Sequence, residues 1–244
     1  PDGHFPHNPE PLKAHLTDLS DKVVQTGADF GIAVDPDVDR LAFMDEQGTL
    51  FGEEYTLVAC ADFVLSQNKG NTVSNLSSTR ALRDVTQKHG GAYTASAVGE
   101  VNVVNAMKAN KAVIGGEGNG GIILPEAHFG RDALVGIALF LSLLAEKQIS
   151  VSALKKTYPL YYMSKKKIDL DPNIDVDGLL EAMENKYANE TLTTVDGVKI
   201  DFADSWVHLR KSNTEPIIRI YTEAPSQQQA DKLADRFIVE LKTL

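Results

Sequence analysis

The sequence predicts an α/β protein that has two α/β units with mixed or parallel sheets and a smaller α+β C-terminal domain. Three observations support this fold class. Strand-like and helix-like segments alternate over residues 72–147, which is typical of layered α/β structures. Residues 161–244 are instead rich in strand-like segments with a hairpin signal. A length of 244 residues with 43% apolar content is sufficient for more than one core.

The first unit is expected to begin with an amphipathic helix over residues 12–26. Its leucines and valines recur every three or four positions, and Gly27 can end the helix. Two short apolar strands, 30–34 and 41–45, follow and are separated by an acidic turn. A helix over residues 53–67 completes this unit.

Turn residues at 68–71 mark a boundary to the second unit. Strands and helices alternate there, so we expect mostly parallel strands. The expected order is strand 72–77, helix 79–89, strand 92–98, helix 99–110, strand 111–116 and helix 130–147. The last helix contains the apolar run 133–145, which is shorter than the ~20 residues of a membrane span and predicts a buried helix.

Pro159 marks the second boundary, after which the pattern predicts a smaller α+β domain. The expected order is strand 165–170, helix 175–188, a hairpin over 191–202 with an Asp-Gly turn, strands 205–210 and 217–223, and helix 226–244. We therefore divide the chain into domains of residues 1–69, 70–160 and 161–244.

Composition and charge exclude several classes of partner. The net charge of −10 argues against nucleic acid and against an anionic membrane as partners, since both require a basic surface. Cys60 is the single cysteine, so an internal disulfide is excluded and a reducing, cytoplasmic location is expected. The start, PDGHFPHNPEPL, has no initiator Met and no signal-peptide pattern, and we expect the chain to be a fragment.

The run DPDVDR sets Asp35, Asp37 and Asp39 at alternate positions after the first strand, with Arg40 next. Strand ends are common ligand sites in α/β proteins. Three converging carboxylates would raise one another's pKa unless a cation neutralised them. A hard divalent ion with oxygen ligands meets that need, and Mg²⁺ is the natural candidate. A solvent-exposed turn is the alternative.

Two other motifs match this run in part. An EF-hand would use the three aspartates and Glu46, but it requires Gly where Arg40 stands and a helix where we expect a strand. A D-x-D phosphatase motif of the haloacid-dehalogenase type is also incomplete, because Asp39 stands where Thr or Val is usual.

The segment GGEGNGGIILPE, residues 115–126, contains the pattern G-x-G-x-x-G after a strand. A dinucleotide site would need a helix there, and Pro125 opposes one. The glycines allow close approach of the backbone to a polar ligand, to which Glu117 and Asn119 offer hydrogen bonds, and Glu117 suits sugar hydroxyls. A plain glycine turn is the alternative.

The segment HLRKSNTEPIIRIYTE, residues 208–223, imitates a helix capping box through Ser212 and Glu215. Pro216 and the alternating residues after it favour a strand, a loop and a second strand. Hydroxyls, an amide and guanidinium groups in this geometry suit a phosphate. The candidate phosphate ligands are Arg210, Ser212, Asn213, Thr214 and Arg219.

Together, DPDVDR, GEGNGG and RKSNTEP resemble the metal, sugar and phosphate loops of the α-D-phosphohexomutases, in the order of that family. The family includes phosphoglucomutase, phosphomannomutase and phosphoglucosamine mutase. The resemblance implies that residues 1–69 are the metal-binding portion of family domain two, so that this first unit is incomplete. It implies that 70–160 and 161–244 are the sugar-binding domain three and the phosphate-binding domain four.

The resemblance also implies an activity and a set of roles. These enzymes are intramolecular phosphotransferases that interconvert hexose or hexosamine 1-phosphate and 6-phosphate through a phosphoserine and a bisphosphorylated sugar. The implied roles are Mg²⁺ binding by Asp35, Asp37 and Asp39, catalysis by Arg40 and Arg80, sugar binding by Glu100, Glu117 and Asn119, and phosphate binding by Arg210, Ser212, Asn213, Thr214 and Arg219. For Arg80 and Glu100, a plain surface charge is the alternative.

The chain departs from the family pattern at three places. The serine loop T-A-S-H-N-P is absent, so the chain alone is expected to lack turnover and to need the missing N-terminal domain as its partner. Asn119 and Gly121 stand where Ser and His are common, and Ser77 takes the place of a lysine. A non-catalytic sugar-phosphate or metal-binding module and a phosphatase remain as alternative functions.

Overall fold

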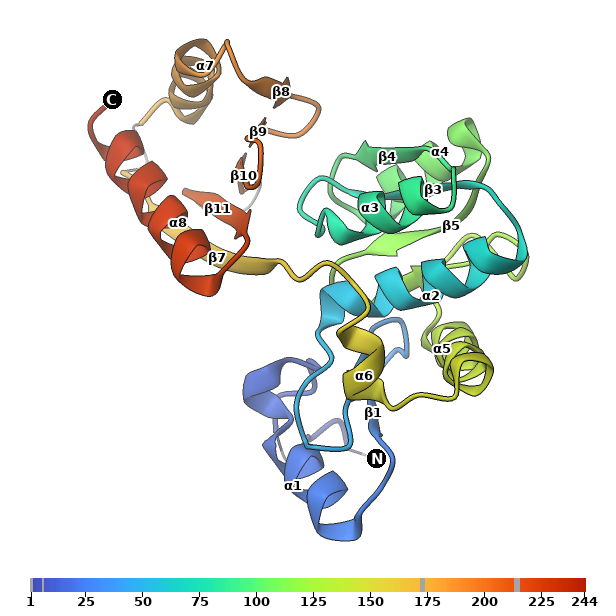
Figure 1. Cartoon of the computed structure of the whole chain (residues 1–244). Coiled ribbons are helices and arrows are strands. Elements are labelled where there is room, and N and C mark those ends of the chain that lie inside the picture. Colours follow the sequence, from blue (N-terminus) through green and yellow to red (C-terminus); the bar gives the residue numbers. More distant parts are fainter. Residues whose placement is uncertain (1, 6, 172–173, 213–215) are drawn as a thin grey trace. The chain divides into compact units, whose positions relative to one another are not determined.

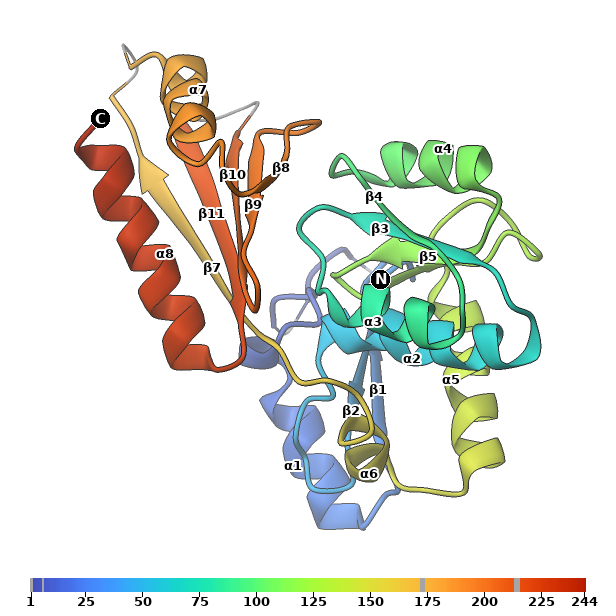
Figure 2. The ribbon, with the colours of Figure 1, turned by 45° about the horizontal axis from the view of Figure 1, so that its top comes forward.

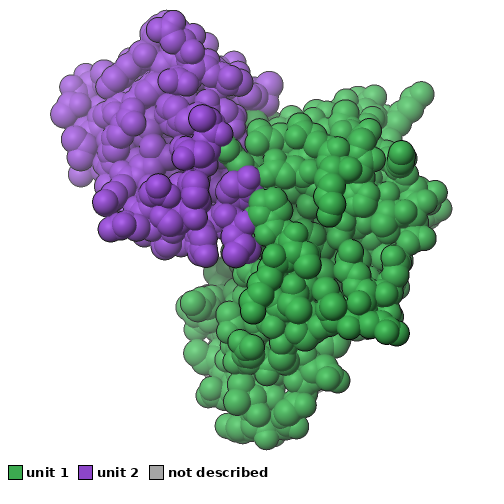
Figure 3. All heavy atoms as spheres, in the orientation of Figure 1, with its two compact units in different colours: residues 1–159 green, residues 160–244 purple. Residues whose placement is uncertain are grey.

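The computed structural model describes residues 2–5, 7–171, 174–212 and 216–244. The chain forms two compact units, Pro1–Pro159 (unit 1) and Leu160–Leu244 (unit 2) (Figure 1, Figure 3). The predicted division of the first 159 residues at residue 69 stays a prediction. Over the described ranges, no helix combines the length and the apolar character that crossing a membrane requires.

Unit 1 begins with a small antiparallel sheet of two strands, β1 (Gly31–Val34) and β2 (Leu41–Met44). The single helix predicted over residues 12–26 is divided in the structure into a short 3-10 helix, η1 (Lys13–His15), and helix α1 (Thr17–Thr26), both of which precede the sheet. Val23 of α1 is buried in one apolar cluster with residues of β2. The two strands that flank the acidic loop are therefore packed against a helix.

A second sheet of unit 1 is mixed, with the strand order β4-β3-β5-β6. Its strands are β3 (Asn71–Asn75), β4 (Tyr93–Ser96), β5 (Ala112–Glu117) and β6 (Gly121–Ile123). β3 pairs in parallel with β4 and β5, whereas β6 returns antiparallel to β5. The predicted α/β layer structure with mixed or parallel strands is confirmed.

Three helices cover this mixed sheet: α2 (Glu53–Gln67), α3 (Ala81–Lys88) and α4 (Glu100–Asn110). In Figure 2, α4 lies on one face, and α2 and α3 lie on the other. The sheet is thus covered on both faces, as parallel strands require. β5 and β6, which flank the glycine-rich loop, are buried in this arrangement.

Helix α5 (Ala133–Lys147) packs against α2 and against the small sheet, and the short helix α6 (Val151–Lys155) follows it. Phe140 of α5 stacks on Phe43 with ring centroids 3.8 Å apart. The prediction of a buried helix is wrong for one side, because Leu134 and Leu141 are 67% and 40% exposed. The helix carries apolar residues on every side, but only one stripe of them is buried against the core.

Unit 2 is an antiparallel sheet of five strands in the order β7-β11-β10-β9-β8, with two helices. The elements are β7 (Tyr162–Asp169), α7 (Val176–Lys186), β8 (Thr191–Thr193), β9 (Val198–Asp201), β10 (Trp206–Lys211), β11 (Ile217–Ala224) and α8 (Gln227–Lys242). β8 and β9 form the predicted Asp-Gly hairpin. Leu209 and Ile220 form a cross-strand pair that belongs to the unit's apolar core, with Phe237 of α8. The predicted smaller α+β domain is confirmed.

Candidate functional site

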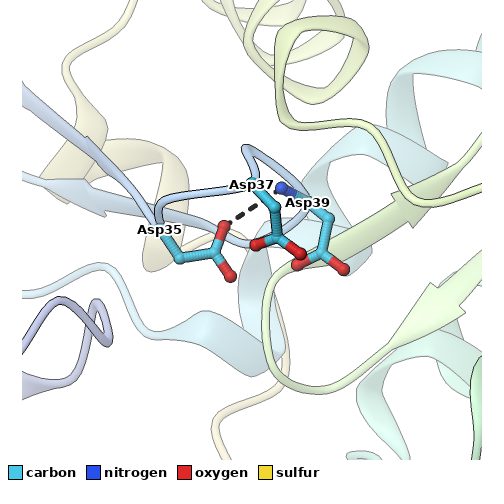
Figure 4. Close-up of side chains that lie close together, drawn as sticks. All are labelled: Asp35, Asp37 and Asp39. Carbon is cyan, nitrogen blue, oxygen red and sulfur yellow. Dashed lines mark hydrogen bonds between the residues drawn. The ribbon is translucent and has the colours of Figure 1, made fainter. Parts of the chain in front are cut away.

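The loop between β1 and β2 brings the three predicted metal ligands together. Asp35, Asp37 and Asp39 each offer a carboxylate oxygen, and these atoms all lie within 4.8 Å of one another (Figure 4). Oδ1 of Asp35 accepts hydrogen bonds from the backbone N–H groups of Asp39, at 3.0 Å, and Arg40, at 2.9 Å. The loop thus closes around Asp35 and turns the other two carboxylates toward it.

Val38, at the tip of this loop, has a left-handed backbone with a φ of 59°. A β-branched residue rarely adopts that conformation, which costs roughly 1–2 kcal/mol. Two backbone bonds hold it: Val38 N–H donates to Asp35 at 3.1 Å, and Ala133 N–H donates to the Val38 carbonyl at 3.0 Å. Because Ala133 is the first residue of α5, this helix start fixes the loop.

The charges in the loop move the pKa values of Asp35 and Asp39 in opposite directions. Burial alone would raise the pKa of Asp35, but hydrogen bonds from the Arg40 N–H and from Asp39 hold it below its usual value. Burial and the adjacent Asp35 carboxylate raise the pKa of Asp39, although Arg131 opposes this shift. Two adjacent carboxyl groups repel each other when both are ionised, so one of them holds its proton more tightly. A cation would relieve this repulsion.

The three carboxylates fit a hard divalent cation, which prefers oxygen ligands. Asp35 is oriented by two N–H donors, as metal-binding carboxylates commonly are. Glu46, the remaining EF-hand position, lies elsewhere: it accepts from the hydroxyl and N–H of Ser152 at 2.5 and 3.2 Å. Despite burial, these bonds lower the pKa of Glu46 to about 2. A strand, β2, also follows the loop, so the EF-hand alternative is excluded.

Arg131 is a site residue that sequence reasoning missed. Its guanidinium pairs with Asp39, with Glu117 at 2.9 Å and with Glu100 at 3.4 Å. Its backbone N–H also donates to Glu100 at 3.0 Å. The available signal was weak: an arginine directly before an apolar helix in an acidic chain. Arg131 links the metal loop to the two predicted sugar ligands.

The predicted sugar ligands lie at the ends of two elements. Glu117 ends β5 and is only 6% exposed; Asn75 donates to it at 2.9 Å and the Gly99 N–H at 3.3 Å. Glu100 begins α4. Asn119 accepts from the N–H of Gly121 at 3.1 Å, which closes the glycine loop. The described residues after this loop form the strand β6, so the helix that a dinucleotide motif requires does not begin there.

The two predicted catalytic arginines lie near these loops. Arg40 is partly exposed, pairs with Glu10 at 2.8 Å and lies 3.5 Å from Asp35. Arg80 is buried at the N-terminal end of α3. Ser78, two residues before Arg80, accepts from the Gly118 N–H at 3.1 Å. The loop that carries Arg80 therefore contacts the glycine loop directly.

Unit 2 holds the predicted phosphate ligands. Arg210 of β10 and Arg219 of β11 are direct cross-strand partners, so their side chains leave the same face of the sheet. Both carboxylate oxygens of Asp196 accept from Nε of Arg210 at 2.8 Å. The Ser212 N–H donates to Ile217 at 3.0 Å, as the predicted strand, loop and strand require. Asn213 and Thr214 lie outside the described residues.

Three family models match the chain. They are described as phosphoglucomutase/phosphomannomutase alpha/beta/alpha domain II, over residues 1–48, alpha/beta/alpha domain III, over 52–161, and the C-terminal domain, over 171–239. The three matches follow the order of the metal, sugar and phosphate loops.

Curated relatives show the same similarity. The chain is 38% identical over 234 residues to "Phosphoglucomutase/phosphomannomutase" of Thermococcus kodakarensis, which covers 94% of this chain and 51% of the relative. It is 35% identical over 242 residues to "Probable phosphoglucosamine mutase" of Methanopyrus kandleri, which covers 98% and 53%. The chain thus spans about half the length of the curated relatives it matches.

A solved structure also resembles this chain in fold. A phosphoglucomutase/phosphomannomutase family protein from Burkholderia thailandensis superposes with a TM-score of 0.85 at 29% identity. This match covers 99% of this chain and 53% of the other.

Proposed function

The chain belongs to the phosphoglucomutase/phosphomannomutase family, and from this premise we propose that it is the metal-, sugar- and phosphate-binding part of a phosphohexomutase. The reaction would interconvert the 1-phosphate and 6-phosphate of a hexose or hexosamine. It would proceed through an enzyme phosphoserine and a bisphosphorylated sugar. We also propose a cytoplasmic location.

One observation carries this proposal: Arg131 pairs with Asp39 of the metal loop and with Glu117 of the glycine loop. Two acidic loops far apart in the sequence therefore lie side by side. Their contact supports a site where a metal-bound phosphoryl group and sugar hydroxyls lie within reach of each other. A solvent-exposed turn or a plain glycine turn would not need this contact.

The roles of the residues follow from their chemistry. Asp35, Asp37 and Asp39 would hold Mg²⁺. A bound Mg²⁺ would supply positive charge to the phosphoryl group during transfer. Arg40, beside the same loop, would add a guanidinium donor at that group. Phosphoryl transfer depends mainly on such positioning and charge stabilisation.

The sugar and its other phosphate would be held by the remaining candidates. Glu100 and Glu117 would accept hydrogen bonds from sugar hydroxyls, with Asn119 beside them. Arg210 and Arg219 would bind the phosphate that does not react, because two guanidinium groups on one strand pair suit a dianion. Ser212, Asn213 and Thr214 would complete that site.

The nucleophile is proposed to lie outside this chain. The tripeptide TAS at 94–96 ends strand β4, where Ser96 is buried and its hydroxyl donates to the Ala97 carbonyl at 2.8 Å. This environment does not suit an exposed phosphoserine. We expect this chain alone to bind ligands without turning them over.

Titration calorimetry of the chain with Mg²⁺ and with glucose 6-phosphate tests the proposal. Asp37→Asn should weaken Mg²⁺ binding at least ~10-fold, because loss of even an outer-shell partner of a metal ligand typically costs that much affinity. Asp29→Asn, an exposed aspartate just before β1, is the matched control and should leave binding unchanged. Equal Mg²⁺ binding by Asp37→Asn would remove the metal assignment.

An assay with glucose 1-phosphate separates the alternatives. Formation of glucose 6-phosphate by this chain alone would contradict the absence of the nucleophile. Release of inorganic phosphate would instead favour a hydrolase. If an Asp37→Asn change in a longer protein that contains this chain left mutase turnover intact, the chain would be better described as a non-catalytic binding module.

A further inference from the structure

Arg131 contacts three carboxylates that belong to three different segments of unit 1. It pairs with Asp39 in the loop after β1, with Glu117 at the end of β5 and with Glu100 at the start of α4. Its side chain is only 15% exposed. One guanidinium has five N–H donors in a planar fork and can serve several acceptors at once. Arg131 therefore acts as the shared counter-ion of the metal loop and the sugar ligands.

Gly121 leaves the space that the Arg131 side chain fills. A Cβ atom at position 121 would lie 2.4 Å from Cδ and 3.1 Å from Cγ of Arg131. The backbone of Gly121 does not adopt the left-handed region, so its φ angle alone does not require glycine. Oδ1 of Asn119 would lie 3.1 Å from the same Cβ, so Arg131 is the nearer of two side chains that leave no room for one here.

The position of this guanidinium creates a conflict with a metal ion. Asp35, Asp37 and Asp39 converge within 4.8 Å, and Arg131 supplies one positive charge to Asp39. A divalent cation on the same carboxylates would draw on the Asp39 oxygens and would lie close to the guanidinium. Like charges that close repel each other, most strongly where little water screens them.

We propose that Arg131 is a positioning residue that holds Asp39 while the metal is absent, yields it when Mg²⁺ binds, and keeps Glu117 and Glu100 in place for the sugar. This inference rests on the proposed metal site. It predicts effects of opposite sign for the two ligands: removal of the guanidinium strengthens Mg²⁺ binding and weakens sugar-phosphate binding. A general loss of structure would weaken both.

The test measures binding of Mg²⁺ and of glucose 6-phosphate to the whole chain by calorimetry, with Mn²⁺ electron paramagnetic resonance as a second metal readout. Arg131→Gln should bind Mg²⁺ at least ~5-fold more tightly than the wild type, the lower end of typical couplings between sites. It should bind glucose 6-phosphate more weakly. Arg131→Lys keeps the charge and should stay close to the wild type for Mg²⁺.

A matched control isolates the charge effect. Arg83 on α3 pairs only locally, with the adjacent Asp84 at 3.5 Å, among the contacts of the described chain. Arg83→Gln removes the same charge from unit 1 without removing an ion pair to the metal loop, and it should leave Mg²⁺ affinity unchanged. Circular dichroism confirms that each variant is folded before titration.

Gly121→Ala provides an independent approach, because the added Cβ displaces Arg131 without removing it. This variant should shift Mg²⁺ affinity in the same direction as Arg131→Gln. The double variant should show no further gain, since both changes break the same ion pair.

The outcomes distinguish the inference from the proposed function. If the wild type binds Mg²⁺ and Asp37→Asn does not, but Arg131→Gln binds equally or more weakly, the inference is overturned and the metal site stands. If neither the wild type nor Arg131→Gln binds Mg²⁺, both are overturned. Tighter Mg²⁺ binding by Arg131→Gln with unchanged glucose 6-phosphate binding would remove the link to the sugar.

Discussion

Both units hold a residue whose charge has the same sign as the proposed ligand. In unit 1, Arg131 pairs with Asp39 at the proposed cation site. In unit 2, Asp196 pairs with Arg210 at the proposed anion site. Each internal ion pair neutralises a cluster of like charges that would otherwise repel one another.

The two ion pairs differ in how they are built. Arg131 and Asp39 are separated by 92 positions and meet where the start of α5 packs beside the small sheet. Asp196 lies in the hairpin turn before β9, and Arg210 lies on β10, the next strand. The site in unit 1 therefore depends on tertiary packing, whereas the site in unit 2 depends mainly on strand register.

Core substitutions should have the largest effects on the stability of the two units. Phe140→Ala removes the ring that stacks on Phe43 beneath the metal loop, and Phe237→Ala opens the core of unit 2. Each should cost about 3–5 kcal/mol of its unit's unfolding free energy. Hydrogen exchange by mass spectrometry, resolved by unit, measures both. Phe140→Ala should also weaken Mg²⁺ binding, because α5 holds the loop through Val38; unchanged binding would contradict that dependence.

The pH response should differ between the units because of His208. Burial lowers the pKa of this histidine to about 4, although its bond to the Asp196 carbonyl at 2.6 Å opposes the shift. The unfolded chain takes up the proton near pH 6.5, so the stabilisation is full above that pH and is lost as pH falls toward 4. Unit 2 should lose roughly 3 kcal/mol of unfolding free energy over this range.

Trp206, the single tryptophan of the chain, lies on β10 two residues from His208 and reports on this transition. Urea unfolding followed by its fluorescence, at pH 7 and near pH 4.5, measures the loss. His208→Gln should flatten the pH dependence. If the wild type and this variant lost the same free energy, His208 would not be the titrating group.

The smallest expected effect tests whether Asp196 opposes phosphate binding as Arg131 is proposed to oppose Mg²⁺ binding. Asp196→Asn removes the carboxylate from Arg210 and should strengthen binding of inorganic phosphate a few-fold, about 5-fold at most. Asp177→Asn is the matched control, since Asp177 pairs with Lys211, the neighbour of Arg210, at 2.6 Å. Phosphate titrations of both variants measure the difference. Weaker binding by Asp196→Asn would show that Asp196 orients Arg210 and does not compete with the ligand.

Much of the fold was predictable because its signals are local. The three- and four-residue spacing before Gly27 predicts α1, and the alternation around Arg219 predicts β11. The apolar run 133–145 identifies α5 but does not reveal that Leu134 and Leu141 are exposed. Which side of an apolar helix is covered depends on neighbours that the run itself does not specify.

By itself, the sequence determined most element types, the three-aspartate loop and the two strands that carry Arg210 and Arg219, because each follows from short-range periodicity and turns; the pairing of Arg210 with Arg219 came from the strand register. Tertiary structure alone decided that Arg131 reaches Asp39 and Glu117 and that Gly121 leaves space for it. Ion pairs between distant segments form only where packing brings opposite charges together, and no local spacing in the chain encodes that distance.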